Sequence, residues 1–298
     1  MMSSESRTSP QNPPDAIPPN RFPDLLISAF EVLRPLNCAI TFASVLLGGW
    51  LGLRALPPRL SLAALSASLI AGGGNVLNDL CGIEEDRINK PGRPLPSGRL
   101  PVGIARLEAV FFLSFGLGCG QILPIPAPFI ALVAALGLVL YNVWLKRVPL
   151  LGNLLVSAIG GLAFVYGGAS VQAPLPALMP ALFAFLFHAG REILKDLEDM
   201  AGDRLRKGST LPLRWGRRNA RIFACAAYLL VILSTPWPGI SGPYGIRYLS
   251  LVFALDILLA YVIFGLWRAR TPDAFRRLSG LLKIGMLLGL CAFFLDTL

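Results

Sequence analysis

The sequence predicts an all-α, polytopic membrane protein whose single folded domain is one helix bundle. Hydrophobic residues fill 54% of the 298 positions and charged residues only 15%, whereas a soluble globular protein carries roughly 25% charged residues. Apolar runs of about 20 residues, the length that crosses a bilayer as a helix, recur along the chain. Alternation with a period of two residues is absent, which argues against a membrane β-barrel.

Nine apolar runs follow one another, and we expect each to form a transmembrane helix. They lie near residues 36–53, 59–80, 104–123, 126–144, 150–170, 177–194, 219–236, 248–267 and 278–296. Residues 1–23, which precede them, hold six prolines, several serines and no apolar run. That composition predicts a disordered tail. The expected organisation is therefore a cytoplasmic tail over residues 1–23 and a nine-helix domain over residues 24–298.

The net charge of +10 is explained by where the basic residues lie. With the N-terminus in the cytoplasm, all but three of the 27 Lys and Arg residues fall in the tail, the cytoplasmic loops or the adjoining helix ends. The three exceptions are Arg54, Arg59 and Arg247. This is the positive-inside distribution, so we expect a cytoplasmic N-terminus and a membrane lipid environment. No nucleic acid partner is expected, and no obligate protein partner is evident.

Cysteine and histidine do not indicate a metal site. The five cysteines are scattered through apolar segments without a CxxC pair, and the single histidine is His188. Neither a thiolate metal site nor a disulfide framework is expected. A histidine in an apolar run is most often a packed helix residue, but its position one turn from Arg191 leaves a role at the substrate open.

Two acidic motifs follow the second and sixth apolar runs. In the first, Asn78, Gly82 and Asp86 recur every four residues and share a face if the helix continues that far. In the second, REILKDLEDMAGD over 191–203, three aspartates recur at spacings of three and four. Both runs cross the membrane in the same direction. The motifs are therefore expected at the cytoplasmic end of the bundle, with their acidic faces turned toward each other.

The composition of these motifs predicts a cation and a phosphate ligand. Carboxylates on one helix face repel one another unless a cation lies between them. Oxygen ligands without His or Cys favour Mg²⁺ over Zn²⁺, and Mg²⁺ usually binds through a few carboxylates together with substrate phosphates. Since the interior of the bundle is apolar, a molecule with a diphosphate head and a hydrocarbon tail fits both environments. Neighbouring Lys and Arg residues would neutralise the remaining phosphate oxygens.

Four stretches resemble motifs of the UbiA superfamily of intramembrane prenyltransferases. NDLCGIEEDRINKPGRPLPSGR resembles its first Asp-rich motif and REILKDLEDMAGD its second. LRPLN at 33–37 and YNVWLKRVPLLGN at 141–153 resemble its first-helix motif and its Tyr/Lys segment. The resemblance implies nine helices around a central cavity and Mg²⁺-dependent transfer of a prenyl group from an allylic diphosphate to a lipophilic acceptor. The two Asp-rich motifs look most similar to digeranylgeranylglyceryl phosphate synthases, which implies a geranylgeranyl group and a prenylglycerol phosphate acceptor in ether-lipid synthesis.

The candidate site residues form two sets. The expected ligands of Mg²⁺, with two ions bridging the substrate diphosphate, are Asn78, Asp79, Glu85, Asp86, Asp196, Asp199 and Asp203, all catalytic candidates except Glu85. The expected substrate-binding residues are Arg34, Asn37, Lys90, Arg93, Tyr141, Lys146, Arg191 and Lys195. Of these, Arg34, Asn37 and Tyr141 rest mainly on the resemblance.

One position departs from the superfamily pattern, because Gly82 stands where the pattern has Asp. Either Glu85, seven residues after Asn78 and on nearly the same helix face, takes the missing place, or the site has one carboxylate fewer. We expect Glu85 to take it.

Three other functions are compatible with the sequence. They are an aromatic-acceptor prenyltransferase of the quinone or chlorophyll type, a lipid-binding member with weakened catalysis, and a transporter. Transport sites usually lie near the bilayer midplane on broken helices, whereas these motifs lie at the cytoplasmic helix ends. A prenyltransferase that uses a lipid acceptor is therefore the favoured prediction.

Overall fold

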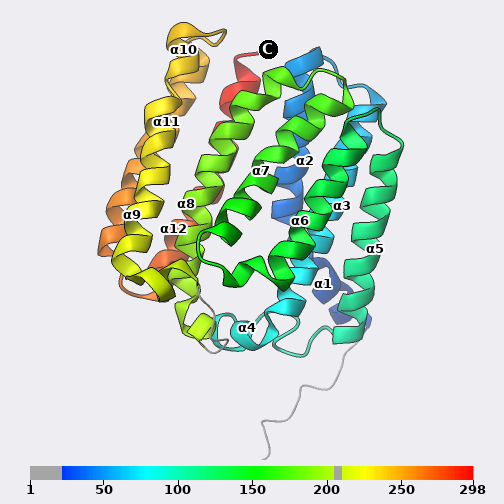
Figure 1. Ribbon diagram of the computed structural model, residues 1–298, viewed down its shortest axis with the longest axis vertical. Coiled ribbons are helices and arrows are strands. Elements are labelled where there is room, and N and C mark those ends of the chain that lie inside the picture. Colours follow the sequence, from blue (N-terminus) through cyan, green and yellow to red (C-terminus); the bar gives the residue numbers. More distant parts are fainter. Residues whose placement is uncertain (1–21, 205–209, 298) are drawn as a thin grey trace, which may run out of the picture.

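The computed structural model describes residues 22–204 and 210–297, and its regular elements there are all helices (Figure 1). The predicted tail over residues 1–23 lies outside the described residues except for its last two, which begin the first helix. The helices in order are α1 Phe22–Val32, α2 Pro35–Leu53, α3 Pro58–Cys81, α4 Ile83–Asn89, α5 Val102–Gln121, α6 Ala127–Val143, η1 Leu145–Arg147, α7 Leu151–Ser170, η2 Leu175–Ala177, α8 Leu178–Asp203, α9 Leu211–Ser234, α10 Trp237–Ser241, α11 Ile246–Arg268 and α12 Pro272–Leu295.

The long helices run side by side as one bundle (Figure 1). Among the described residues, eight helices are long and apolar enough to cross a membrane, and α6, with 17 residues, is a shorter apolar helix. Together they correspond to the nine predicted runs. Their outer faces carry exposed apolar side chains, such as Leu107 and Phe111 on α5 and Phe253 on α11. Continuous apolar surface of this kind is suited to lipid rather than to water.

Small residues bring the inner helices into close contact. A Cβ added to Gly48 of α2 would meet the backbone carbonyl of Phe164 on α7, and one added to Gly167 of α7 would meet the carbonyl of Val45. Membrane helices commonly pack through such small residues, because lipid supplies no hydrophobic force between them and close backbone approach is needed for dispersion contacts. The α2–α7 pair therefore forms a tight wall inside the bundle.

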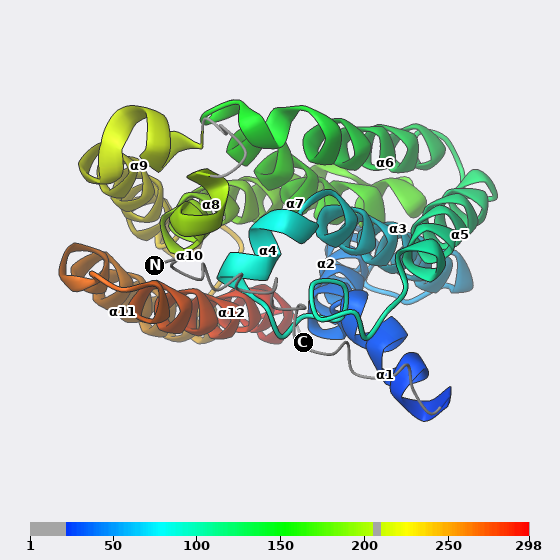
Figure 2. The same ribbon diagram turned by 90° about the horizontal axis from the view of Figure 1, so that it is seen from below.

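The short helix α4 lies across one end of the bundle, between α3 and α8 (Figure 2). The chain does not continue as one unbroken helix through the first acidic motif, because α3 ends at Cys81 and α4 begins at Ile83. Gly82 forms the junction with φ −112° and ψ 14°. This break turns the second half of the motif toward the end of α8, where the second acidic motif lies. α10 and the C-terminal end of α12 lie at the opposite end of the bundle (Figure 1).

Candidate active site

A cavity of about 220 Å³ lies between α2, α3, α6, α7, α8 and α12, and we call it the main cavity. One part of its wall is polar and the rest is apolar. The polar lining residues are Arg34, Asn37, Thr41, Ser44, Asn75, Asn78, Tyr141, Asn142, Tyr166, His188, Arg191, Glu192 and Lys195. The apolar lining includes Ile70, Ile130, Leu138, Val156 and Ile159. A ligand bound here would meet charged groups on one side and hydrocarbon on the other.

A second, largely apolar cavity of about 70 Å³ adjoins the first. The two cavities share Ile40, Ser44, His188 and Met286 as lining residues. Beyond them the second cavity is lined by aromatic and aliphatic side chains, including Phe187 and Phe293. The interior thus offers apolar space in two directions from the polar wall.

The carboxylates of the first motif are held by two arginines. Arg93 Nη1 donates to Asp86 Oδ2 at 2.6 Å and to Asp79 Oδ1 at 3.1 Å, and Arg34 forms an ion pair with the same oxygen of Asp79. Asp79 and Asp86 are both buried. Burial alone would lower the pKa of Arg93, but the carboxylates of Asp79 and Asp86 outweigh it, so this pKa lies above its ordinary value. Arg93 therefore stays charged between the two carboxylates.

Asn78 is fixed by its own amide contacts. Its Nδ2 donates to Asn142 Oδ1 on α6 at 2.8 Å, and its Oδ1 accepts from Arg34 Nη2 at 3.3 Å. Asn142 in turn donates to the backbone carbonyl of Leu138 at 2.9 Å. The amide of Asn78 is therefore oriented by one partner on α6 and one in the turn that precedes α2.

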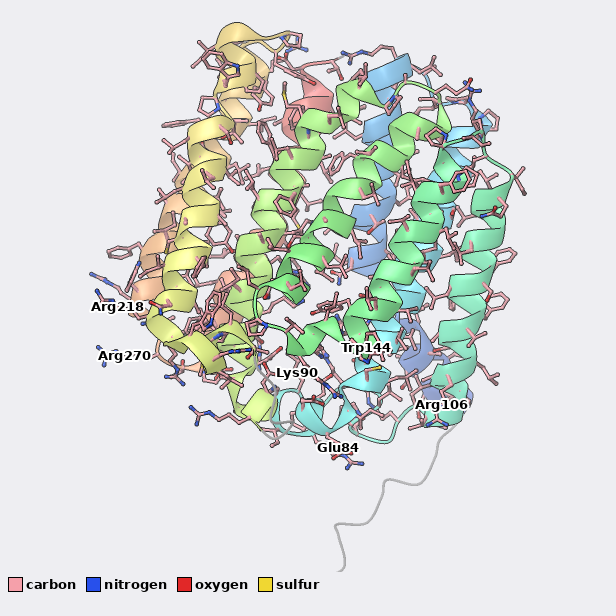
Figure 3. All side chains as sticks on the ribbon, viewed as in Figure 1. Glu84, Lys90, Arg106, Trp144, Arg218 and Arg270 are labelled. Atoms are coloured by element: carbon pink, nitrogen blue, oxygen red, sulfur yellow. The ribbon has the colours of Figure 1, made fainter. Side chains whose placement is uncertain are left out.

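Residues of the first motif also bind the second motif directly. Lys90 Nζ donates to both carboxylate oxygens of Asp199 at 2.6 Å. Asn89 Nδ2 donates to the Asp199 carbonyl at 2.9 Å, and Asn89 Oδ1 accepts from the Gly202 N–H at 2.9 Å. In Figure 3, Lys90 lies at the end of the bundle, whereas Glu84 lies on the outer side of α4. The two motifs, far apart in sequence, therefore form one continuous cluster.

Further up α8, the remaining acidic groups have partners on neighbouring positions and helices. Asp196 Oδ2 accepts from Asn153 Nδ2 of α7 at 2.9 Å. Glu192, which is buried, accepts from Lys195 at 2.8 and 3.0 Å and from Arg191 at 3.4 Å. A buried carboxylate in a membrane helix needs such cationic partners, because an isolated charge is costly there.

Lys146 lies beside Gly82. A Cβ added at Gly82 would lie 3.3 Å from Lys146 Nζ and 3.9 Å from Asp86 Oδ2, and Glu85 is not among its nearest groups. Glu85 is buried, its backbone carbonyl packs against Gly202, and it lies within electrostatic range of Asp203. The structure thus puts an ammonium group, not the carboxylate of Glu85, at the position where the sequence pattern predicts Asp.

The structure brings the predicted residues together at one end of the bundle and adds several that the sequence analysis missed. Asn37 and Tyr141 line the main cavity, and Asp203 lies within electrostatic range of Asp199, Lys146 and Lys90. The missed residues are Asn89, Asn142, Asn153, Glu192, Glu198 and Arg276, the last of which donates to Glu198 at 3.1 Å. A polar residue inside an apolar run, such as Asn142 or Asn153, is the sequence signal that could have identified some of them.

The oxygen ligands of the acidic cluster are of the kind that binds a hard cation such as Mg²⁺. The acidic groups of the cluster are Asp79, Glu85, Asp86, Asp196, Asp199 and Asp203, and the basic ones are Arg34, Lys90, Arg93 and Lys146. Acidic groups exceed basic ones, and the available donors are oxygens, as Mg²⁺ requires. Within the described residues, no three or more Asp, Glu, His or Cys side chains are arranged closely enough to hold a metal ion together. Instead, most of these carboxylates are turned to basic side chains or amides.

The chain is similar to known proteins over most of its length, and residues 38–287 match the UbiA prenyltransferase family. Digeranylgeranylglyceryl phosphate synthase of Methanopyrus kandleri is 38% identical over 276 residues, which cover 90% of this chain and 98% of that protein. The enzyme of the same name from Hyperthermus butylicus is 33% identical over 297 residues, with 92% and 98% coverage.

Solved structures are similar over nearly the same length. A structure that concerns digeranylgeranylglyceryl phosphate synthase in membranes has a TM-score of 0.68 and 31% identity, and covers 92% of this chain and 99% of its own. A UbiA homologue from Archaeoglobus fulgidus bound to GPP and Mg²⁺ has a TM-score of 0.64 and 14% identity, with 89% and 99% coverage. The second likeness is one of fold.

Proposed function

The chain belongs to the UbiA prenyltransferase family, and we propose that it transfers a geranylgeranyl group from geranylgeranyl diphosphate to a prenylated glycerol phosphate. It is a transferase of prenyl groups and an integral membrane protein with a UbiA-type helical fold. The named relatives, which match along nearly their whole length, support the acceptor.

The observation that carries the proposal is the main cavity, which joins a charged wall to an apolar interior. A prenyl diphosphate has the same two halves, and its tail would be kept from water by the helices. The adjoining second cavity, of about 70 Å³, extends this apolar space toward Phe187 and Phe293. The hydrocarbon chain of a lipid acceptor can use such apolar space, whereas a small aromatic acid does not need it.

In the proposed reaction, the C–O bond of the allylic diphosphate breaks and the diphosphate leaves with the electron pair. The acceptor hydroxyl forms the new C–O bond and loses its proton, which the departed diphosphate can accept. Lys90, Arg93 and Lys146 would stabilise negative charge on the leaving group. The apolar wall would protect the allylic cation from water.

The carboxylates of Asp79, Glu85, Asp86, Asp196, Asp199 and Asp203, with the amide oxygen of Asn78, would hold Mg²⁺, and the two motifs offer enough oxygens for two ions. When bound, Mg²⁺ would neutralise charge on the diphosphate oxygens and so ease C–O cleavage. Lys90 and Arg93 now bind carboxylates that would serve the metal. We infer that these two side chains turn to the diphosphate when the substrate and its metal bind.

We further propose that the N-terminus and this cluster face the cytoplasm. All but three of the 27 basic residues belong to the cytoplasmic side in that orientation. The exceptions, Arg54, Arg59 and Arg247, lie near the end of α2 and the starts of α3 and α11.

The test is transfer by the purified protein in lipid nanodiscs, with labelled geranylgeranyl diphosphate, Mg²⁺ and a panel of acceptors. The panel contains geranylgeranylglyceryl phosphate, 4-hydroxybenzoate and chlorophyllide, and mass spectrometry identifies the product. We expect an ether product from the glycerol phosphate lipid and its loss when EDTA removes Mg²⁺. Transfer to an aromatic acceptor but not to the glycerol phosphate lipid would contradict the proposal.

A further inference from the structure

Arg191 lies in the wall of the main cavity with part of its binding capacity unused. Its side chain is 11% exposed, and among the described residues its hydrogen bonding is limited to one 3.4 Å bond from Nη1 to Glu192. Its buried Nε has no hydrogen-bond partner among the described residues. A buried guanidinium normally satisfies its five donors, so an incompletely satisfied guanidinium in a cavity wall indicates a site for an acceptor oxygen.

Lys283 of α12 lies at about the same level along the bundle as Arg191 of α8. Gly285 of α12 packs against Phe187 of α8, and the two helices run in opposite directions (Figure 1). Arg191 comes one turn after Phe187 on α8, and Lys283 comes two residues before Gly285 on α12. Because the helices are antiparallel, both residues therefore lie on the side of this contact that faces the acidic motifs. Met286, one turn from Lys283 on the same helix, lines the main cavity, whereas the half-buried side chain of Lys283 is not part of that lining.

The charges here are not balanced by protein groups. Lys283 lies within electrostatic range of Arg191 and Arg34, and no ion pair or hydrogen bond of Lys283 occurs among the described residues. Glu192 is already bonded twice by Lys195. Arg191 and Lys195 share the carboxylate of Glu192. Lys283 therefore adds a positive charge without an ion pair inside a membrane bundle, where an unpaired cation is costly and usually marks a functional site.

The region around Arg191 and Lys283 has an excess of positive charge, whereas the acidic cluster has an excess of negative charge. Because carboxylates outnumber cations around the two motifs, that part of the site is suited to a metal ion bound together with the diphosphate. Arg191 precedes Asp199 by eight residues, about 12 Å along a helix axis. A second anion at Arg191 would be separated from the diphosphate by this distance, which reduces the repulsion between the two.

We propose that Arg191 and Lys283 form a separate binding site for the phosphate monoester of the acceptor lipid. The inference rests on the proposed function for the identity of the acceptor. It moves Arg191 from the diphosphate-binding set to the acceptor. It also requires the flexible side chain of Lys283, on the last helix, to turn into the cavity and bind the phosphate. The hydroxyl that attacks the allylic carbon would then be held between the two anion sites.

The test measures binding of geranylgeranylglyceryl phosphate and of geranylgeranylglycerol, which lacks the phosphate, to the full chain in nanodiscs without donor. We expect the wild type to prefer the phosphate form and Lys283→Met to lower that preference by about tenfold or more, as loss of a charged hydrogen bond does. Lys283→Arg should retain it. Arg277→Met removes an exposed cation from the same helix and should change nothing. In transfer assays, Lys283→Met should raise the KM for the acceptor and leave the KM for geranylgeranyl diphosphate unchanged.

Full phosphate preference in Lys283→Met, or an equal loss of affinity for the diphosphate donor, would overturn the inference even if transfer is observed. Failure of the proposed function can be told apart from failure of the binding site. A Lys283-dependent preference for the phosphate lipid, in a protein that transfers no prenyl group to it, would support the site and contradict the proposed function.

Discussion

At the scale of single residues, Gly82 shows most directly how this site differs from the superfamily pattern. The position is not an open space, because Lys146 Nζ would lie 3.3 Å from a Cβ there. Its backbone angles, φ −112° and ψ 14°, are accessible to any residue. An acidic side chain at position 82 would therefore meet the ammonium group of Lys146.

We predict that Gly82→Asp folds and raises the KM for the diphosphate donor by roughly three- to tenfold. The new carboxylate would bind Lys146 and compete with the phosphate oxygens for it, an effect of about 1 kcal/mol. Steady-state kinetics at saturating Mg²⁺ would measure it. Gly82→Asn, of equal size and without charge, should leave the donor KM near that of the wild type. A lower Mg²⁺ requirement and faster turnover in Gly82→Asp would show instead that the site lacks a ligand.

Residue roles could be predicted only in part from the sequence. The aspartates were identifiable because they recur at helical spacing after apolar runs. Their amide partners were not, because Asn142 binds Asn78 across 64 positions and Asn153 binds Asp196 across 43. Such pairs depend on which helices become neighbours, and helical periodicity within one segment carries no information about that.

At the scale of elements, α4 connects the two acidic motifs. Asn89 at its end bonds backbone groups in the last turns of α8, and Gly202 allows the two helices to touch. The sequence predicted the apolar helices well, because an apolar run of bilayer length is a strong signal. Among the described residues eight of them are long enough to cross a membrane, and α6 is shorter. The separation of α4 from α3 was not predicted, since it depends on a single break at Gly82.

Gly202→Ala tests this contact. Its Cβ would lie 2.5 Å from Asn89 Nδ2 and 2.6 Å from the Glu85 carbonyl, so α4 must move away from α8. We predict a loss of about 1–3 kcal/mol in packing, a lower melting temperature in detergent and slower turnover. Gly118→Ala on α5, where nothing lies within 4 Å of the added Cβ, is the matched control. Unchanged melting and turnover in Gly202→Ala would show that α4 and α8 need not touch.

At the scale of the whole molecule, orientation in the membrane decides which compartment supplies the substrates. We predict that a membrane-impermeant thiol reagent labels a cysteine at Pro243 from outside intact cells, and does not label one at Gly92. Both positions are exposed, and they lie at opposite ends of the bundle. The background would have its five cysteines replaced. The reverse pattern would contradict both the cytoplasmic N-terminus and the cytoplasmic active site.

The central claim is that the two acidic motifs act as one site for prenyl transfer. The most direct measurement compares turnover in Asp86→Asn, Asp199→Asn and the double variant, with melting temperatures to confirm folding. Residues that act as a unit are strongly non-additive. We predict that each single change lowers turnover by well over tenfold, a loss of more than about 1.4 kcal/mol in transition-state stabilisation, and that the double variant is about as slow as the slower single. Near-wild-type turnover in either single variant, or a double loss equal to the product of the two, would contradict a shared site.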